Sequence, residues 1–215
     1  MVTGPKGVGK ATLAYKMARF LLSNAPTNVK DTALFGNVLE KKAITTLNTN
    51  LESQPNCLIS AGSNPDLMVV EKSEDPKTGK MRNNILVEDI RKINSFFHKT
   101  STAGGWRIAI VDTADEMNRN AANAILKTLE EPPEHVKFIF ATTEIRKVPV
   151  TVLSRCQRFD LRRIEPEVMI DHLKSIAGQE NAEIAEDALA LITRAAEGSV
   201  RDAMSLLDQA IAHGA

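Results

Sequence analysis

The chain carries Gly4-Pro5-Lys6-Gly7-Val8-Gly9-Lys10 near its start, and this segment fits the phosphate-loop pattern G-x-x-x-x-G-K. Glycines in such a loop let backbone N–H groups close around phosphate oxygens. The following helix adds partial positive charge at its N-terminus, and Lys10 can reach the outer phosphates. The segment therefore predicts a nucleotide site at a strand-to-helix junction, against the plainer reading of a glycine-rich turn before a helix.

The residues around this loop depart from the usual pattern at two places. Ala11 stands where a Ser or Thr hydroxyl normally holds Mg²⁺. Thr12 is a poor replacement, because one residue rotates a side chain by about 100° around a helix. A phosphate loop also needs a preceding strand, and three residues come before Gly4. We therefore expect a phosphate site with a weakened metal site, and a first strand that is a stub or truncated.

Composition indicates an ordinary globular protein of one large domain, or of a large and a small one. The chain has 215 residues, of which 43% are hydrophobic and 4% aromatic, so its core must be aliphatic. Its 27 basic and 27 acidic residues balance, which favours neither nucleic acid nor an anionic membrane globally. Cys57 and Cys156 form no C-x-x-C pair, so we expect no zinc site and a reducing, cytoplasmic setting. No apolar stretch is long enough to span a membrane.

Apolar patterns predict strands that alternate with helices. Strands are expected at 67–70, 107–112 and 137–143, with a short one at Phe159, and helices at 9–22, 29–40, 87–98 and 118–131. Residues 41–64 are polar and mixed, and 71–84 look like a loop or hairpin insertion. Nearly continuous apolar strands are typical of a doubly wound α/β sheet that is covered on both faces. Ligands bind at the carboxyl ends of such strands, where Lys10, Asp112 and Thr142 should converge.

The character of the sequence changes after Ile164. Three helical patterns follow, at 166–178, 186–198 and 199–213, without any strand pattern. They predict a small three-helix bundle. We therefore expect an α/β domain over residues 1–163 and a helical domain over 164–215.

Several motifs together resemble bacterial clamp-loader AAA+ subunits of DNA polymerase III. The most particular are the helix end Leu126-Lys127-Thr128-Leu129-Glu130-Glu131-Pro132-Pro133 and Ser154-Arg155-Cys156. The resemblance covers essentially the whole chain: it is to the delta-prime subunit up to about residue 125, and to gamma/tau from about 134. It implies an AAA+ P-loop NTPase sheet followed by a helical lid. The family's collar domain and four-cysteine zinc module are not found in the sequence.

The resemblance also implies roles for single residues. Asp112 takes the acidic position on the Mg²⁺ side, and Thr113 stands where a glutamate should polarise water. Asp115 and Glu116 are expected on a different face. Arg155 matches the arginine finger, which acts in trans on nucleotide bound to a neighbouring subunit. The nucleotide-binding set that the resemblance implies is Gly4, Gly7, Gly9, Lys10, Ala11, Thr12, Thr142, Thr143 and Arg201.

The implied function is that of a delta-prime or gamma/tau subunit in a hetero-oligomeric ring that loads the sliding clamp onto primer-template DNA. ATP or ADP and Mg²⁺ would be its ligands, with weak or no hydrolysis of its own because of Ala11 and Thr113. Two alternatives stay open: an active gamma/tau-type ATPase motor, and a truncated or chimeric fragment without function. Plainer readings of the residues also stay open, with Asp112 as a strand cap, Thr142 and Thr143 as ordinary strand residues, and Arg155 and Arg201 as surface charges.

Overall fold

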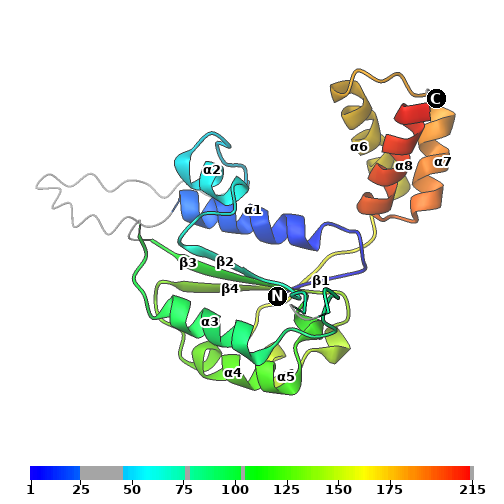
Figure 1. The fold of residues 1–215 in the computed structure, drawn as a ribbon. Helices are drawn as coiled ribbons and strands as arrows, with labels where there is room; N and C mark the ends of the chain where they lie inside the picture. Colours follow the sequence, from blue (N-terminus) through cyan, green and yellow to red (C-terminus); the bar gives the residue numbers. More distant parts are fainter. Residues whose placement is uncertain (25–45, 76–77, 103–104, 214–215) are drawn as a thin grey trace, which may run out of the picture.

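A computed structural model describes residues 1–24, 46–75, 78–102 and 105–213 (Figure 1). The helix predicted at 29–40 lies outside these residues. Five parallel strands form one sheet in the order β2-β3-β4-β1-β5. The strands are β1 (Val2–Thr3), β2 (Leu67–Val70), β3 (Arg107–Asp112), β4 (Val136–Thr142) and β5 (Phe159–Asp160). The parallel sheet confirms the predicted α/β architecture.

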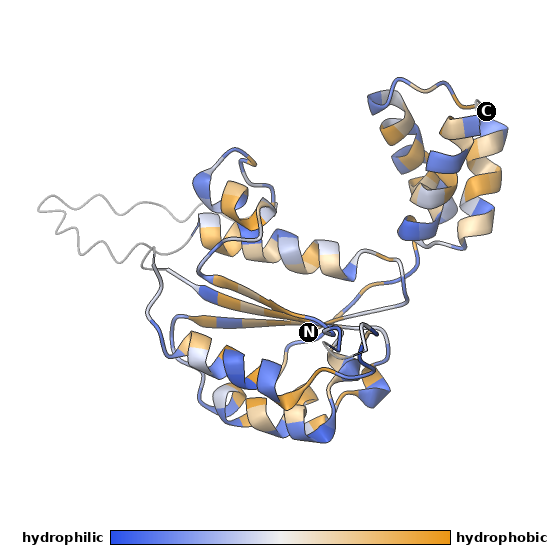
Figure 2. Cartoon of the chain, in the orientation of Figure 1, coloured by the Kyte–Doolittle hydropathy of each residue, from blue (hydrophilic) through white to orange (hydrophobic). Residues whose placement is uncertain are grey.

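Strand β3 and most of strand β4 are buried because helices cover both faces of the sheet (Figures 1 and 2). One face packs against α1 (Lys10–Ser23), whose Ala14 and Ala18 are fully buried. The other face packs against α3 (Val87–Phe97), α4 (Arg119–Glu130) and α5 (Val150–Leu153). Apolar side chains on both sides of a strand explain the continuous apolar runs in the sequence.

The register of the strands brings their carboxyl ends to one edge of the sheet. Asp112 pairs with Ala141 between β3 and β4, and Thr3 pairs with Thr142 between β1 and β4. A single 3-10 turn, η1 (Ala114–Glu116), follows β3, and a second one, η2 (Ile145–Lys147), follows β4. The residues that leave these strands are therefore close neighbours.

One helix departs from the expectation of an irregular segment at 41–64. This helix, α2 (Gln54–Ser60), packs beside α1 and has a proline in its first turn. It buries Ile59 and Asn56, and the Asn56 amide donates hydrogen bonds to the Thr49 hydroxyl and the Asn50 carbonyl. Seven residues with a polar buried side chain show too little apolar periodicity to be recognised from sequence.

The last three helices form a bundle with its own core, as the sequence predicts (Figure 1). They are α6 (Pro166–Gln179), α7 (Glu186–Ala196) and α8 (Val200–His213). Met169, Leu173, Leu189 and Leu207 are its largest fully buried side chains. Among the residues described, no helix is long and apolar enough to cross a membrane.

Candidate nucleotide-binding site

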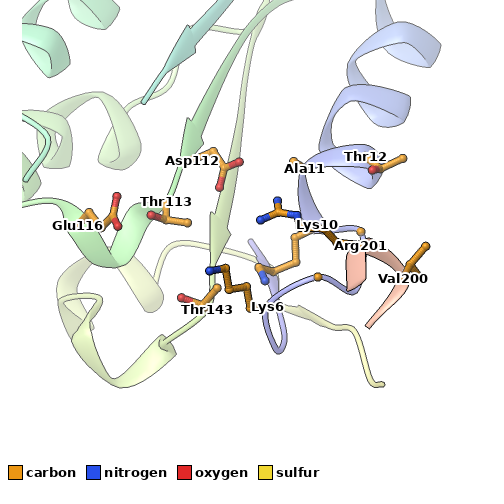
Figure 3. A pocket seen from close by; sticks show the side chains of 12 residues that line it. Lys6, Lys10, Ala11, Thr12, Asp112, Thr113, Glu116, Thr143, Val200 and Arg201 are labelled. Carbon is orange, nitrogen blue, oxygen red and sulfur yellow. The ribbon is translucent and has the colours of Figure 1, made fainter. Parts of the chain in front are cut away.

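A cavity of about 470 Å³ lies at the carboxyl edge of the sheet, beside the glycine-rich loop (Figure 3). The glycine-rich loop, the ends of the strands and the helical bundle all contribute residues to its lining. Its lining residues are Lys6, Gly7, Gly9, Lys10, Ala11, Thr12, Asp112, Thr113, Glu116, Thr143, Val200 and Arg201. Eight of the eleven predicted site residues are thus brought together.

Lys10 is the first residue of α1 and lies buried against the loop itself. Its ammonium donates hydrogen bonds to the carbonyls of Gly4 at 2.9 Å and Pro5 at 2.6 Å. Burial lowers the pKa of Lys10, and the nearby carboxylate of Asp112 opposes this shift. Gly4 does not line the cavity, and its part in the site is this carbonyl contact.

The helical bundle reaches the cavity through the start of α8. The Arg201 N–H donates a hydrogen bond to the Gly7 carbonyl at 3.2 Å, and Val200 and Arg201 line the cavity. Gly7 has a φ of 82°, and a Cβ added there would lie 2.0 Å from the Ser199 hydroxyl oxygen. Only glycine therefore permits the bundle to approach the loop this closely.

Acidic side chains face the loop from the end of β3. Burial raises the pKa of Asp112, and the neighbouring Glu71 adds to the rise. The expectation that Glu116 lies on a different face is wrong, because the η1 turn brings it into the cavity lining. There the Glu116 carboxylate forms an ion pair with the Lys72 ammonium at 2.7 Å.

Asp115 and Thr142 lie next to the cavity without lining it. Thr142 is fully buried, and its hydroxyl donates to the Asp115 carboxylate at 2.5 Å, whereas Thr143 is exposed and does line the cavity. Burial raises the pKa of Asp115, but hydrogen bonds from Thr142, its own N–H and Thr143 together outweigh burial, so the pKa lies below its usual value. Asp115 is thus ionised at neutral pH.

Arg155 lies away from this cavity, just after α5. Its guanidinium donates hydrogen bonds to the Glu130 carboxylate at 2.6 Å and to the Thr151 carbonyl at 2.7 Å. Within the described part of the chain, Arg155 does not contribute to the lining of the loop cavity. Arg155 instead lines a second cavity, together with Leu129, Cys156 and Phe159.

The cavity fits a phosphate group better than it fits a metal ion. Lys6, Lys10 and Arg201 bring positive charge to it, together with the backbone of the loop. For Mg²⁺ the lining offers the carboxylates of Asp112 and Glu116 but no hydroxyl at position 11. Over the described residues, no group of three His, Cys, Asp or Glu side chains could hold a metal by itself.

Sequence reasoning missed Lys6 and Glu116 as lining residues. Lys6 lies between the first two loop glycines, so its position inside the motif was a usable signal. Glu116 carried no such signal, because its place depends on the η1 turn. Val200 enters through the approach of the bundle, which no local pattern indicates.

Two family models together match nearly the whole chain. The model described as "DNA polymerase III, delta subunit" matches residues 1–165. The model described as "DNA polymerase III clamp loader subunit, ATPase lid domain" matches residues 169–215.

Curated relatives and solved structures agree with these matches. DNA polymerase III subunit tau of Escherichia coli is 37% identical over 214 residues, which are 100% of this chain and 29% of tau. Subunit tau of Bacillus subtilis is 45% identical over 125 residues, 58% of this chain and 22% of tau. The RuvB Holliday junction branch migration motor of Thermotoga maritima has the same fold, with a TM-score of 0.58 at 16% identity, over 96% of this chain and 52% of RuvB.

The chain thus spans less than a third of the length of these two tau relatives. Its parallel sheet and helical bundle form an AAA+ fold, and its sequence matches DNA polymerase III family models over residues 1–165 and 169–215. The chain belongs to the family of DNA polymerase III clamp-loader subunits.

Proposed function

We propose that this chain is the AAA+ module of a delta-prime-type clamp-loader subunit, which binds nucleotide but hydrolyses it weakly or not at all. One observation carries the proposal: the glycine-rich loop, Lys10 and Arg201 line the cavity together, while Ala11 and Thr113 occupy two positions that hydrolysis needs. Phosphoryl transfer depends on metal positioning and on an oriented water, so each loss removes a separate support.

In this proposal the loop N–H groups, Lys10 and Arg201 hold the phosphates of ATP or ADP. Gly4, Gly7 and Gly9 give the loop its shape, Ala11 and Thr12 begin the helix beneath the phosphates, and Thr142 and Thr143 end the strand opposite. Mg²⁺, when bound, would neutralise phosphate charge on the Asp112 side. Lys10 would exchange its bonds to the loop carbonyls for phosphate oxygens, which are stronger acceptors for a cation.

Arg155 is the proposed arginine finger for the nucleotide of a neighbouring subunit. Its side chain keeps one-third of its surface exposed, and Glu130 holds the guanidinium in place. A finger supplied in trans raises the turnover of the partner's site by roughly 10³–10⁵-fold. A subunit can therefore lose its own hydrolysis and still be needed for that of the complex.

The proposal places the chain in a hetero-oligomeric ring with other clamp-loader subunits, which loads the sliding clamp onto primer-template DNA in the cytoplasm. Residues 1–163 would form the nucleotide-binding domain and residues 164–215 the lid. The two family matches, at 1–165 and 169–215, support this division. The similarity of residues 169–215 to an ATPase lid domain supports a nucleotide ligand.

A second candidate is an active ATPase motor of the gamma/tau type. It is favoured by the curated relatives, which are tau and gamma subunits. In that case the cavity would hydrolyse ATP despite Ala11 and Thr113, with Asp112 and Glu116 supplying its carboxylates.

Nucleotide binding and turnover of the purified chain separate the two candidates. We expect the native chain to bind ATP. Lys10→Ala should lower its affinity for ATP by at least about tenfold, because a cation–phosphate contact is lost. Lys16→Ala is the matched control, since Lys16 is an exposed lysine on the same helix. Turnover by the chain alone that Lys10→Ala abolishes would instead support the motor.

The finger is tested in a complex rebuilt from the clamp-loader subunits of the same organism. Arg155→Ala should lower ATP turnover at the neighbouring subunit's site by about 10³-fold or more, although the variant still binds its own nucleotide. Arg162→Ala is the control, because Arg162 is an exposed arginine close by in sequence. Equal turnover with Arg155→Ala and Arg162→Ala would contradict the proposed role.

A further inference from the structure

The carboxylate of Asp115 holds two consecutive residues at the end of β4. Its Oδ1 accepts hydrogen bonds from the Thr142 hydroxyl at 2.5 Å and from the Thr143 N–H at 3.1 Å. Its Oδ2 accepts a third hydrogen bond from the Thr143 hydroxyl at 3.2 Å. A hydroxyl group has a single hydrogen, so the Thr143 hydroxyl has none for another acceptor while it donates to Asp115.

This commitment decides what Thr143 can offer to the cavity. Thr143 lines the cavity, and Figure 3 shows its hydroxyl oxygen on the side away from Lys10. A phosphate oxygen only accepts hydrogen bonds, and the lone pairs that remain on the Thr143 hydroxyl accept them too. In this arrangement the hydroxyl offers no hydrogen to a terminal phosphate, and the negative charge of Asp115 lies directly behind it.

We infer that Asp115 is a specificity-determining positioning residue, which withholds the Thr143 hydroxyl from the terminal phosphate of a bound nucleotide. As a consequence, the cavity gains little from the third phosphate and distinguishes ATP weakly from ADP. The inference rests on the proposed function, because it assumes that the cavity binds nucleotide.

Asp115→Asn reverses one hydrogen bond with little change in shape. The amide oxygen, in the place of Oδ1, still accepts from the Thr142 hydroxyl and the Thr143 N–H. The amide nitrogen, in the place of Oδ2, donates to the Thr143 oxygen and so releases the hydroxyl hydrogen toward the cavity. A new hydrogen bond to a charged phosphate should tighten ATP binding by about tenfold relative to ADP.

The matched control combines Asp115→Asn with Thr143→Val. Both variants lack the negative charge of Asp115, so their comparison isolates the hydroxyl of Thr143. We expect the double variant to lose the gain that Asp115→Asn shows. Thr143→Val alone should leave the ratio of the two dissociation constants within about twofold of the native ratio, because the native hydroxyl does not donate to nucleotide.

The measurement is the Kd for ATP and for ADP, by titration of the purified chain in the presence of Mg²⁺, with urea unfolding to check each variant. The inference is overturned if Thr143→Val alone weakens ATP about tenfold relative to ADP. It is also overturned if the double variant binds ATP as tightly, relative to ADP, as Asp115→Asn does. A third contrary result is that Asp115→Asn still binds ADP through Lys10 but has the native ratio of the two dissociation constants. Absence of any nucleotide binding by the native chain would overturn the proposed function as well. If Asp115→Asn does not fold, the ratio of the two dissociation constants in Thr143→Val tests the inference by itself.

Discussion

Single residues at the strand ends are set by competition between burial and hydrogen bonding. Burial raises the pKa of Asp112 and of Asp115 alike, but only Asp115 receives enough hydrogen bonds to bring its pKa below the usual value. Two carboxylates three positions apart in the sequence thus have pKa values that are shifted in opposite directions. Asp115 links η1 to the end of β4 and is a structural anion, whereas Asp112 faces the cavity.

The pH dependence of folding should report this anion. Because the folded pKa of Asp115 is depressed, its stabilisation is fully present above the unfolded value of about 3.9 and is lost as the pH falls through the lower folded value. Asp115 is only partly buried, so we expect Asp115→Asn to reduce the free energy of unfolding by about 1 kcal/mol at pH 7. Urea unfolding from pH 7 downward should show this difference shrinking below about pH 4.

An acidic residue on the lid bundle provides the comparison for that titration. Asp171 is exposed on α6, so Asp171→Asn should change the free energy of unfolding by less than about 0.5 kcal/mol throughout. A deficit of Asp115→Asn that stays constant into the acid range would contradict the role of the ionised carboxylate.

Among the elements, α4 joins the two regions of proposed function. It begins at the Asn118 cap, directly after the η1 turn that carries Glu116 into the cavity. It ends at Glu130, which holds Arg155. Its twelve residues span about 18 Å at 1.5 Å per residue. A rigid helix therefore separates the chain's own nucleotide cavity from the finger that it would offer to a neighbour.

The start of α4 depends on one side-chain hydrogen bond. The Asn118 side chain accepts a hydrogen bond from the Ala121 N–H at 2.8 Å, so Asn118→Ala leaves that N–H without its partner. We expect a loss of about 1 kcal/mol in the free energy of unfolding, measured by urea denaturation. Asn120→Ala, at an exposed position in the same turn, should stay within about 0.5 kcal/mol. Equal losses in both variants would argue against the cap.

Elements with a continuous apolar pattern could be predicted from the sequence, and elements defined by polar contacts could not. The strands at Leu67–Val70 and Arg107–Asp112 have the predicted bounds, because each contains a continuous apolar run, and the run in the second strand is buried on both faces. The helix α2 was missed because it buries Asn56 through side-chain hydrogen bonds. Glu116 was misplaced because a single 3-10 turn, which has no periodicity, decides where it points.

At the scale of the whole molecule, the bundle and the sheet meet over the phosphate loop. Three helices could be predicted from the apolar pattern after Ile164, but their docking could not, because it depends on two residues far apart in sequence. Gly7 has no side chain, and Ser199 occupies the space that a side chain there would need. The Arg201 N–H then bonds to the Gly7 carbonyl. The same glycine therefore lines the proposed phosphate site and gives the bundle room to approach the loop.

Gly7→Ala should separate the bundle from the loop without unfolding either part. The new Cβ would lie 2.0 Å from the Ser199 oxygen and 3.0 Å from the Ser199 Cβ, so Ser199 must shift, and we expect the bond from the Arg201 N–H to the Gly7 carbonyl to lengthen or break. We expect the Arg201 amide to exchange its hydrogen at least about tenfold faster, as measured by hydrogen exchange, because local opening then costs less free energy. Gly79→Ala is the matched control, because Gly79 also has a positive φ of 64° but has nothing within 4 Å of an added Cβ. In Gly79→Ala the exchange rate of the Arg201 amide should stay at its native value. An exchange rate that rises in both variants, or in neither, would contradict docking of the bundle through Gly7.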